Sequence, residues 1–225
     1  MVIENTLVTV ISLSTPLVIA VIGETISEKS GVINLSAEGT IMFSALCGFV
    51  FGYLTDFVLI GFFSAAICGG IISIVISYCD IKLRMDQIAI GFILTILLTH
   101  LSNYMGQDYV RINGPIVTKF SIPLLSEIPF IGKVLFNHSL ITYLSILLIP
   151  ISWLFLNKTR LGLSIRASGE NPTAANARGI DVKKMRLIGT VIGGCLLGLA
   201  GATFSLYTKY GWSENHTANY GWIIL

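Results

Sequence analysis

The sequence predicts an all-α, polytopic transmembrane helical bundle with about six spans and one short cytoplasmic helix. Of the 225 residues, 54% are apolar and only 12% are charged, whereas about 25% are charged in an ordinary soluble domain. The mean hydropathy is +0.82, and the apolar residues form long runs instead of the periodic patterns of a water-facing surface. We therefore expect a single integral membrane domain over residues 1–225, in the plasma membrane and in contact with lipid.

Six apolar stretches are long enough to cross a bilayer, which takes about 20 helical residues because every backbone amide must be paired inside the segment. In chain order they are Leu7–Gly23, Glu38–Leu54, Phe57–Cys79, Gln87–Met105, Ser139–Leu156 and Leu187–Tyr207. The chain then closes with an apolar stub, Gly221–Leu225. This stub predicts that a further hydrophobic segment is missing.

The distribution of basic residues predicts the orientation. Segment Asn157–Arg186 holds seven of the fourteen Lys and Arg residues, so the positive-inside rule places it in the cytoplasm. Counting back, Asp80–Asp86 is also inside, whereas Gly106–His138 and the N-terminus are outside. The outer segment has an apolar patch around Ile128–Ile131. It is expected to be either a structured loop with a short re-entrant or interfacial helix, or a simple connector.

Polar residues gather between the first two spans, at a position where apolar residues surround them. Ionisable groups at membrane depth are costly and usually serve a pathway, and broken helices flank the binding sites of many transporters. Gly23, Gly31 and Gly39 would permit such a break. The predicted translocation pathway comprises Glu24, Asn34, Ser36 and Glu38, with Gln87 at the start of the fourth span. An ordinary polar loop is the alternative that remains open.

The cytoplasmic segment contains a short helix with signals at both ends. Asn171 suits an N-cap and Pro172 the first helical position, Ala174 and Ala175 favour helix, and Gly179 suits the residue just past the end. About two turns of helix are unstable alone in water. We therefore predict a docking helix for a soluble partner, with a merely structural turn as the alternative.

Small residues recur every four positions in two of the spans. The sixth span has Gly194, Gly198 and Ala202 in this spacing, and the second span has Gly48 and Gly52. Such stripes let helices approach closely. Packing within the bundle is the first interpretation, and an interface between copies of the chain is the second.

No catalytic or metal-binding pattern occurs in the sequence. GxxxxGK[ST], HExxH and GxSxG are absent, no two of the four cysteines are spaced as CxxC, and the three histidines stand apart. The net charge of +2 is too small for a nucleic-acid-binding domain. The sequence thus predicts no enzyme activity, no catalytic residue, no metal and no cofactor in this chain, and no nucleic-acid partner.

Several stretches resemble the membrane permease subunits of ABC importers, in the branch that handles simple sugars and nucleosides and also includes branched-chain amino-acid permeases. The stretches run from Gly23-Glu24 through Ser30-Gly31-Val32-Ile33-Asn34-Leu35-Ser36-Ala37-Glu38-Gly39, over Asp86-Gln87-Ile88-Ala89-Ile90-Gly91, from Gly162-Leu163 through Gly179-Ile180, and over Glu214-Asn215-x-Thr217-Ala218-x-x-Gly221. Permeases of this kind are usually longer, so the resemblance implies that the chain is truncated at its C-terminus.

The resemblance also implies partners and a function. Glu170, Asn171, Pro172, Ala174, Ala175 and Gly179 would belong to the coupling segment that contacts a separate ATP-binding subunit. Thr173 stands where the similar pattern E-A-A-x-x-x-G has Glu. ATP and magnesium would bind that subunit, a second permease subunit would complete the pathway, and an extracytoplasmic binding protein would deliver a nucleoside or simple sugar. The alternative function is an ion-coupled secondary transporter or a channel, which would use Glu24 and Glu38.

Overall fold

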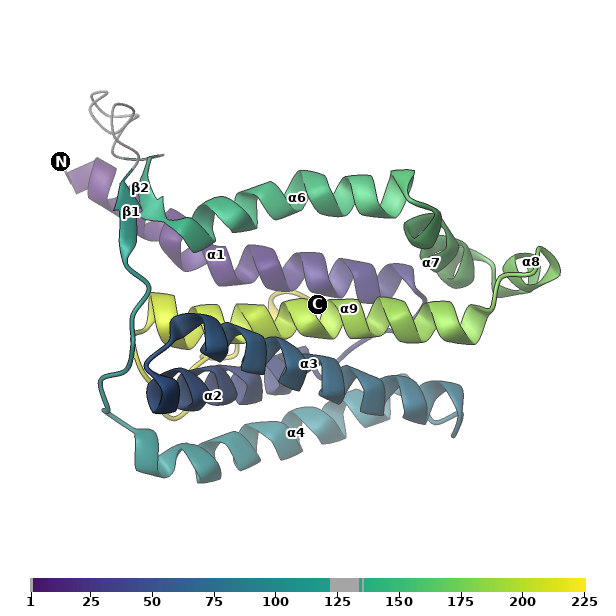
Figure 1. Cartoon of the computed structure of the whole chain (residues 1–225). Helices are drawn as coiled ribbons and strands as arrows, with labels where there is room; N and C mark the ends of the chain where they lie inside the picture. Colours follow the sequence, from purple (N-terminus) through teal and green to yellow (C-terminus); the bar gives the residue numbers. More distant parts are fainter. Residues whose placement is uncertain (1, 122–133, 135) are drawn as a thin grey trace.

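Six long helices dominate the fold, and together they confirm the predicted bundle. A computed structural model describes residues 2–121, 134 and 136–225. The long helices lie side by side (Figure 1) and each is long and apolar enough to span a membrane. They are α1 (Val2–Lys29), α2 (Ala37–Thr55), α3 (Val58–Ile81), α4 (Gln87–Gly106), α6 (Leu140–Lys158) and α9 (Val182–Thr203). Each of them contains most of one predicted span.

Short elements lie at the two ends of the bundle. At one end, called the basic end below, are α7 (Arg160–Glu170) and α8 (Pro172–Ala177). The opposite end holds the 3-10 turn η1 (Gln107–Tyr109) and two antiparallel strands, β1 (Lys119–Ser121) and β2 (Asn137–Ser139). After α9 follow a π-helical turn, η2 (Phe204–Thr208), and a 3-10 turn, η3 (Tyr220–Trp222). The apolar patch around Ile128–Ile131, within the predicted outer segment, lies outside the described residues.

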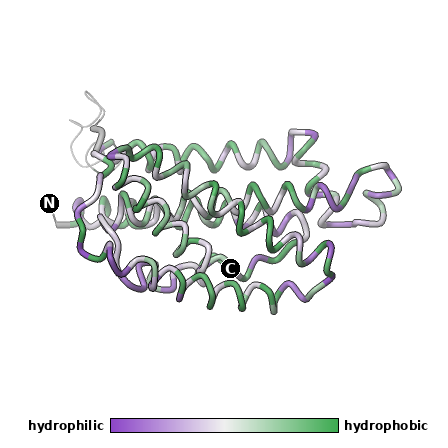
Figure 2. Tube along the Cα trace, turned by 60° about the horizontal axis from the view of Figure 1, so that its bottom comes forward, coloured by the Kyte–Doolittle hydropathy of each residue, from purple (hydrophilic) through white to green (hydrophobic). Residues whose placement is uncertain are grey.

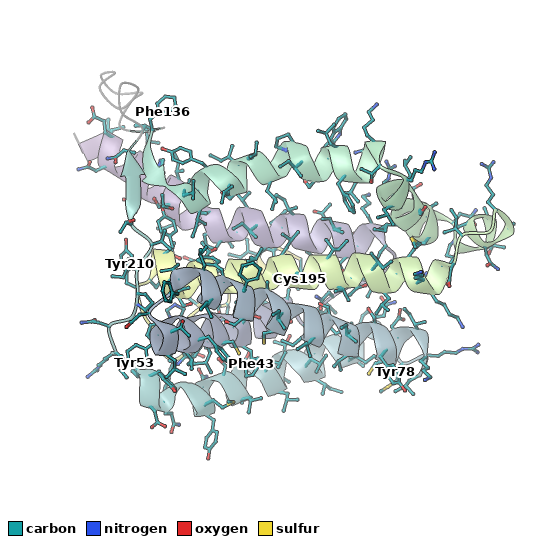
Figure 3. The ribbon with its side chains drawn as sticks, in the orientation of Figure 1. Phe43, Tyr53, Tyr78, Phe136, Cys195 and Tyr210 are labelled. Carbon is teal, nitrogen blue, oxygen red and sulfur yellow. The ribbon has the colours of Figure 1, made fainter. Side chains whose placement is uncertain are left out.

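The outer surface of the bundle suits a bilayer. Large apolar side chains on α3 repeat every four residues and stay exposed, at Leu59, Phe63, Ile67 and Ile71. Figure 2 shows hydrophobic residues along the helices and hydrophilic residues gathered mainly toward the two ends. Tyrosines mark both ends, with Tyr53 and Tyr210 near one and Tyr78 toward the other (Figure 3), as is typical at membrane–water interfaces.

Helix α9 is the centre of the bundle and contacts α1, α2 and α3. Its small-residue stripe makes this possible: a β-carbon added at Gly194 would lie 2.6 Å from the carbonyl oxygen of Gly69, and one added at Gly198 would overlap the Ala65 carbonyl group. Ala202 packs against Gly48 of α2. The stripes therefore serve packing within the bundle, which confirms the first of the two interpretations.

The connection between α1 and α2 folds back into the bundle. α1 continues to Lys29, and the non-helical residues Ser30–Ser36 then return, so that the Asn34 amide reaches Glu24. Gly39, near the beginning of α2, lies against Thr95 of α4. Thr95 is eight residues after the first residue of α4, so α2 begins about 12 Å along α4 from the basic end. This is an interrupted, re-entrant segment and not an ordinary polar loop.

The sequence analysis was wrong about two of the three glycines in this region. Only Gly31 has a positive φ, of 90°, a conformation that glycine adopts readily. Gly23 lies inside α1, where an added β-carbon would lie 2.7 Å from the Gly193 carbonyl oxygen, and Gly39 lies inside α2 against Thr95. These two glycines permit close helix packing and do not break a helix.

The close approach of α9 to α3 predicts the effect of a single methyl group. Gly198→Ala would overlap the Ala65 carbonyl, whereas Gly52→Ala meets its nearest neighbour at 3.5 Å, an ordinary contact. Overpacking typically costs about 1–3 kcal/mol, so we expect Gly198→Ala to lower the thermal unfolding midpoint in detergent and Gly52→Ala to leave it nearly unchanged. Equal midpoints for the two variants would contradict this account of the packing.

Candidate functional site

The first re-entrant segment, Ser30–Ser36, is held by buried polar side chains. Glu24 is 6% exposed and its Oε1 accepts a hydrogen bond from the Asn34 backbone amide at 3.2 Å. The Asn34 side-chain oxygen accepts from the Ser36 amide at 3.1 Å and from its hydroxyl at 2.7 Å. Such bonds are required because non-helical amides at membrane depth have no water to pair with. Three residues of the predicted pathway are thus brought together.

Two atoms of this cluster remain unpaired. Glu24 Oε2 and Asn34 Nδ2 are buried and have no hydrogen-bond partner among the described residues. Buried polar groups are nearly always paired, so an unpaired acceptor next to an unpaired donor calls for an explanation. A hydroxyl group, which both donates and accepts, is one chemical group that could satisfy them.

A second re-entrant segment, Lys209–Leu225, follows α9. Trp212 packs against Gly106 at the far end of α4 and bridges to Val110, whereas Ile224 lies in a buried cluster with Ile19 and Leu197, well inside the bundle. Figure 1 shows the C-terminus about midway along the helices. The chain therefore dips from the end opposite α8 to membrane depth.

Glu38 fixes this second segment. The carboxylate is 4% exposed; its Oε2 accepts from the Gly221 backbone amide at 2.5 Å, and its Oε1 accepts from the Thr217 hydroxyl. A β-carbon at Gly221 would overlap Glu38, so glycine is needed at that position. The sequence analysis missed this contact. The polar residues before Gly221 were the available signal that the stub is not a regular span.

Gln87 lies at a different place from the other predicted pathway residues. It is the first residue of α4, near the basic end, and its side-chain oxygen accepts from the Ile33 amide at 2.9 Å. Its side-chain nitrogen donates to Asp80 Oδ1 at 2.8 Å. Gln87 therefore contacts the backbone of the first re-entrant segment and not the buried carboxylates.

The predicted docking helix is present as α8. Asn171 caps it, accepting from the Ala174 amide at 3.0 Å, Pro172 is its first residue, and Gly179 follows with φ of 81°. Ala175 is buried, whereas Ala174 is exposed. α8 projects beyond the bundle at the basic end (Figure 1). Its exposed side is available for contact with another protein.

Glu170 does not belong to this short helix. It ends a separate helix, α7, which the sequence analysis did not anticipate, and pairs with Arg166 one turn earlier at 3.1 Å. The Thr159 hydroxyl caps the start of α7 by accepting from the Gly162 amide at 3.0 Å. The segment that the sequence analysis expected to be one short helix is thus two consecutive helices that meet at Asn171.

A cavity of about 540 Å³ separates α8 from the ends of α3 and α9. Its lining carries both signs of charge, from Asp80, Arg84, Asp181, Lys183 and Arg186, together with Thr173 and Asn176 of α8. The charges and the volume place a polar space directly behind α8.

The histidines and cysteines of the described residues do not gather into a metal-binding group. Over the described part of the chain, no group of three or more His, Cys, Asp or Glu residues is arranged to hold a metal ion. His138 and His216 are buried at 2% exposure; His216 stacks on Trp212, and His138 lies 2.8 Å from the Val134 carbonyl oxygen. The four cysteines are free and only partly buried.

Comparison with known proteins identifies the family. Residues 6–225 match the profile of the family described as the branched-chain amino acid transport system permease component. The chain belongs to this family. With six apolar spans, it is a multi-pass protein of the plasma membrane.

Three relatives illustrate the range of the family. The putative glucose ABC transporter permease protein TsgC13 of Haloferax volcanii is 36% identical over 93% of this chain and 65% of its own length. The nucleoside ABC transporter permease protein NupC of Lactococcus lactis is 33% identical over 94% of this chain and 70% of its own. The guanosine ABC transporter permease protein NupQ of Bacillus subtilis is 32% identical over 93% and 70%. The chain thus spans about two thirds of each relative's length. No solved structure matches it.

The contacts of Glu38 predict the behaviour of the C-terminal segment. Glu38→Ala leaves the buried Gly221 amide without an acceptor, a cost of about 1–3 kcal/mol. It leaves the Thr217 hydroxyl with only the Met42 sulfur, 3.5 Å away, as a weak acceptor. We expect faster amide hydrogen exchange over residues 213–225. Glu38→Gln can still accept from Gly221 and donate to Thr217, so its effect should be small.

Glu28→Ala supplies a matched control, because Glu28 is an exposed glutamate of α1. Exchange over residues 213–225 that is as slow in Glu38→Ala as in Glu28→Ala would show that Glu38 does not hold the segment.

Proposed function

We propose that this chain is a permease subunit of an ATP-driven ABC importer for nucleosides or simple sugars. The observation that supports the proposal most directly is α8, a capped helix with an exposed small-residue side that projects from the basic end of a permease-family bundle. Glu170, Asn171, Pro172, Ala174, Ala175 and Gly179 would form the coupling segment. α8 would dock on a separate ATP-binding subunit, which holds ATP and magnesium.

An external energy source is needed because a pathway by itself only equilibrates its solute. A permease moves solute uphill when a partner's ATP cycle favours its inward-open and outward-open states unequally. We further propose that a second permease subunit completes the pathway and that an extracytoplasmic binding protein presents the solute at the end opposite α8.

The buried polar groups support a hydroxyl-bearing solute. Glu24, Asn34, Ser36 and Glu38 lie beside non-helical backbone deep in the bundle, and Glu24 and Asn34 each have an unpaired atom. Both nucleosides and simple sugars carry hydroxyl groups that donate and accept hydrogen bonds. The names of the relatives, which include glucose, nucleoside and guanosine permeases, agree with both substrate classes.

An ion-coupled transporter is the rival function, and the unpaired Glu24 Oε2 is the observation that favours it, because buried carboxylates relay protons in such proteins. The two functions differ in their energy source. In proteoliposomes that contain the assembled complex, we expect uptake of a labelled nucleoside or sugar to require ATP and to persist when proton and sodium gradients are collapsed. Uptake driven by an ion gradient without the ATP-binding subunit would establish the rival instead.

Docking through α8 predicts that a bulky residue on its exposed side blocks assembly. Ala174→Trp projects outward and leaves the Asn171 cap intact, so the permease should fold normally but bind the ATP-binding subunit at least about ten-fold more weakly, as large losses at central interface positions do. Copurification in detergent measures this.

Gln107→Trp, which places the same side chain at an exposed position at the opposite end of the bundle, should bind normally. Undiminished copurification of Ala174→Trp would place the docking surface elsewhere.

A further inference from the structure

The side chain of Gln87 connects two parts of the protein that are far apart in sequence. Its amide nitrogen donates to Asp80 at the end of α3, and its amide oxygen accepts from the backbone of Ile33 in the first re-entrant segment. The bonds are 2.8 and 2.9 Å long. A carboxylate on one side and a backbone N–H on the other require one donor and one acceptor in the same side chain, which an amide provides.

Asp80 also reaches the space behind the docking helix. It lines the cavity that separates α8 from α3 and α9, and its second oxygen, Oδ2, is buried without a partner among the described residues. Arg186, at the start of α9, lines the same cavity, and a β-carbon added at Gly31 would lie 3.3 Å from its guanidinium group. The cavity is therefore bounded by α8 on one side and, on the other, by Asp80 and Arg186, and the Arg186 guanidinium also lies next to Gly31 at the beginning of the re-entrant segment.

The re-entrant segment leads directly to the buried polar groups. From Ile33, which Gln87 holds, the next residue is Asn34, bonded to Glu24 and to Ser36. A shift of the Ile33 backbone also shifts the Asn34 amide, because the carbonyl group of Ile33 and the amide of Asn34 belong to the same planar peptide unit. Two hydrogen bonds and the Ile33–Asn34 peptide bond connect Asp80 in the cavity with Asn34, and a third hydrogen bond connects Asn34 with Glu24.

We propose that Asp80 and Gln87 form a latch that sets the position of the re-entrant segment according to the position of α8, so that both are positioning residues for transport. The inference rests on the proposed function, because it assumes that α8 moves with a partner's ATP cycle. Movement of α8 would change the shape of the cavity and the position of the Asp80 side chain. Gln87, which is bonded to both Asp80 and Ile33, would then shift the Ile33 backbone.

Exchanging the two side-chain types tests the latch. Gln87→Glu removes the donor to Asp80 and places a second carboxylate next to it, so the two groups repel each other. Asp80→Asn keeps a side-chain oxygen that accepts from the Gln87 amide nitrogen. In the double variant Asp80→Asn/Gln87→Glu, the amide introduced at position 80 donates to the carboxylate introduced at position 87. That carboxylate still accepts from the Ile33 backbone, so the connection is restored with reversed polarity. Asp80→Asn is therefore the matched control, and the double variant is the rescue.

The measurement is solute uptake per ATP hydrolysed by the assembled complex in proteoliposomes. We expect Gln87→Glu to lower this ratio by about ten-fold, the usual size of a coupling effect, while ATP hydrolysis continues. Asp80→Asn and the double variant should stay within about two-fold of the unsubstituted complex. An unchanged ratio in Gln87→Glu, or a double variant as defective as Gln87→Glu, would overturn the proposal.

Amide hydrogen exchange over Gly31–Ser36 provides a second measurement that needs no transport activity. In Gln87→Glu, repulsion from Asp80 should displace the carboxylate introduced at position 87 from the Ile33 amide. Losing that hydrogen bond should speed exchange by about five-fold, and the double variant should reverse the effect. If the unsubstituted complex neither hydrolyses ATP nor moves solute, the proposed function fails, and the exchange data still decide the latch. Equal exchange in all four proteins would show that no latch exists.

Discussion

Every backbone amide that leaves a helix inside the membrane needs a partner, and this requirement organises the whole of the described structure. Two segments are non-helical at membrane depth, one before α2 and one after α9. Each is held by a buried carboxylate that accepts from a backbone N–H, Glu24 from Asn34 and Glu38 from Gly221. A buried carboxylate is itself unfavourable, and donors that point at it offset that cost. The two unfavourable features, irregular backbone and buried carboxyl groups, stabilise each other.

Helix packing brings the two segments to the same region. α9 contacts three other spans because its glycines let α1 and α3 approach at backbone distance. The start of α2, which carries Glu38, is thereby placed against both α4 and the C-terminal segment. Larger residues along α9 would separate the helices and with them the polar groups. The small-residue stripe is thus a precondition of the buried polar cluster, although none of its members is polar.

The basic end of the bundle has an exposed helix, α8, and hydrogen bonds that lead from its surroundings to the interior. α8 lies at its edge, a charged cavity lies behind α8, and Asp80, Arg186 and Gln87 connect the cavity walls with residues 31–33. In a transporter that is driven by a separate ATP-binding subunit, the docking site and the pathway must be connected by side chains that can adopt more than one conformation. A cavity leaves room for such rearrangement, whereas a close-packed interior resists it.

The sequence by itself determined the fold class, the six spans, the capped helix α8 and the family, because each depends on local properties: run length, cap chemistry and motif spacing. It also placed Glu24, Asn34 and Ser36 together, since they are close along the chain. It could not determine that Glu38 binds Gly221, that Gln87 bridges Asp80 and Ile33, or that Gly23 and Gly39 lie within helices. Those contacts join residues from different spans, and only the tertiary packing decides which spans are neighbours and at what depth they meet.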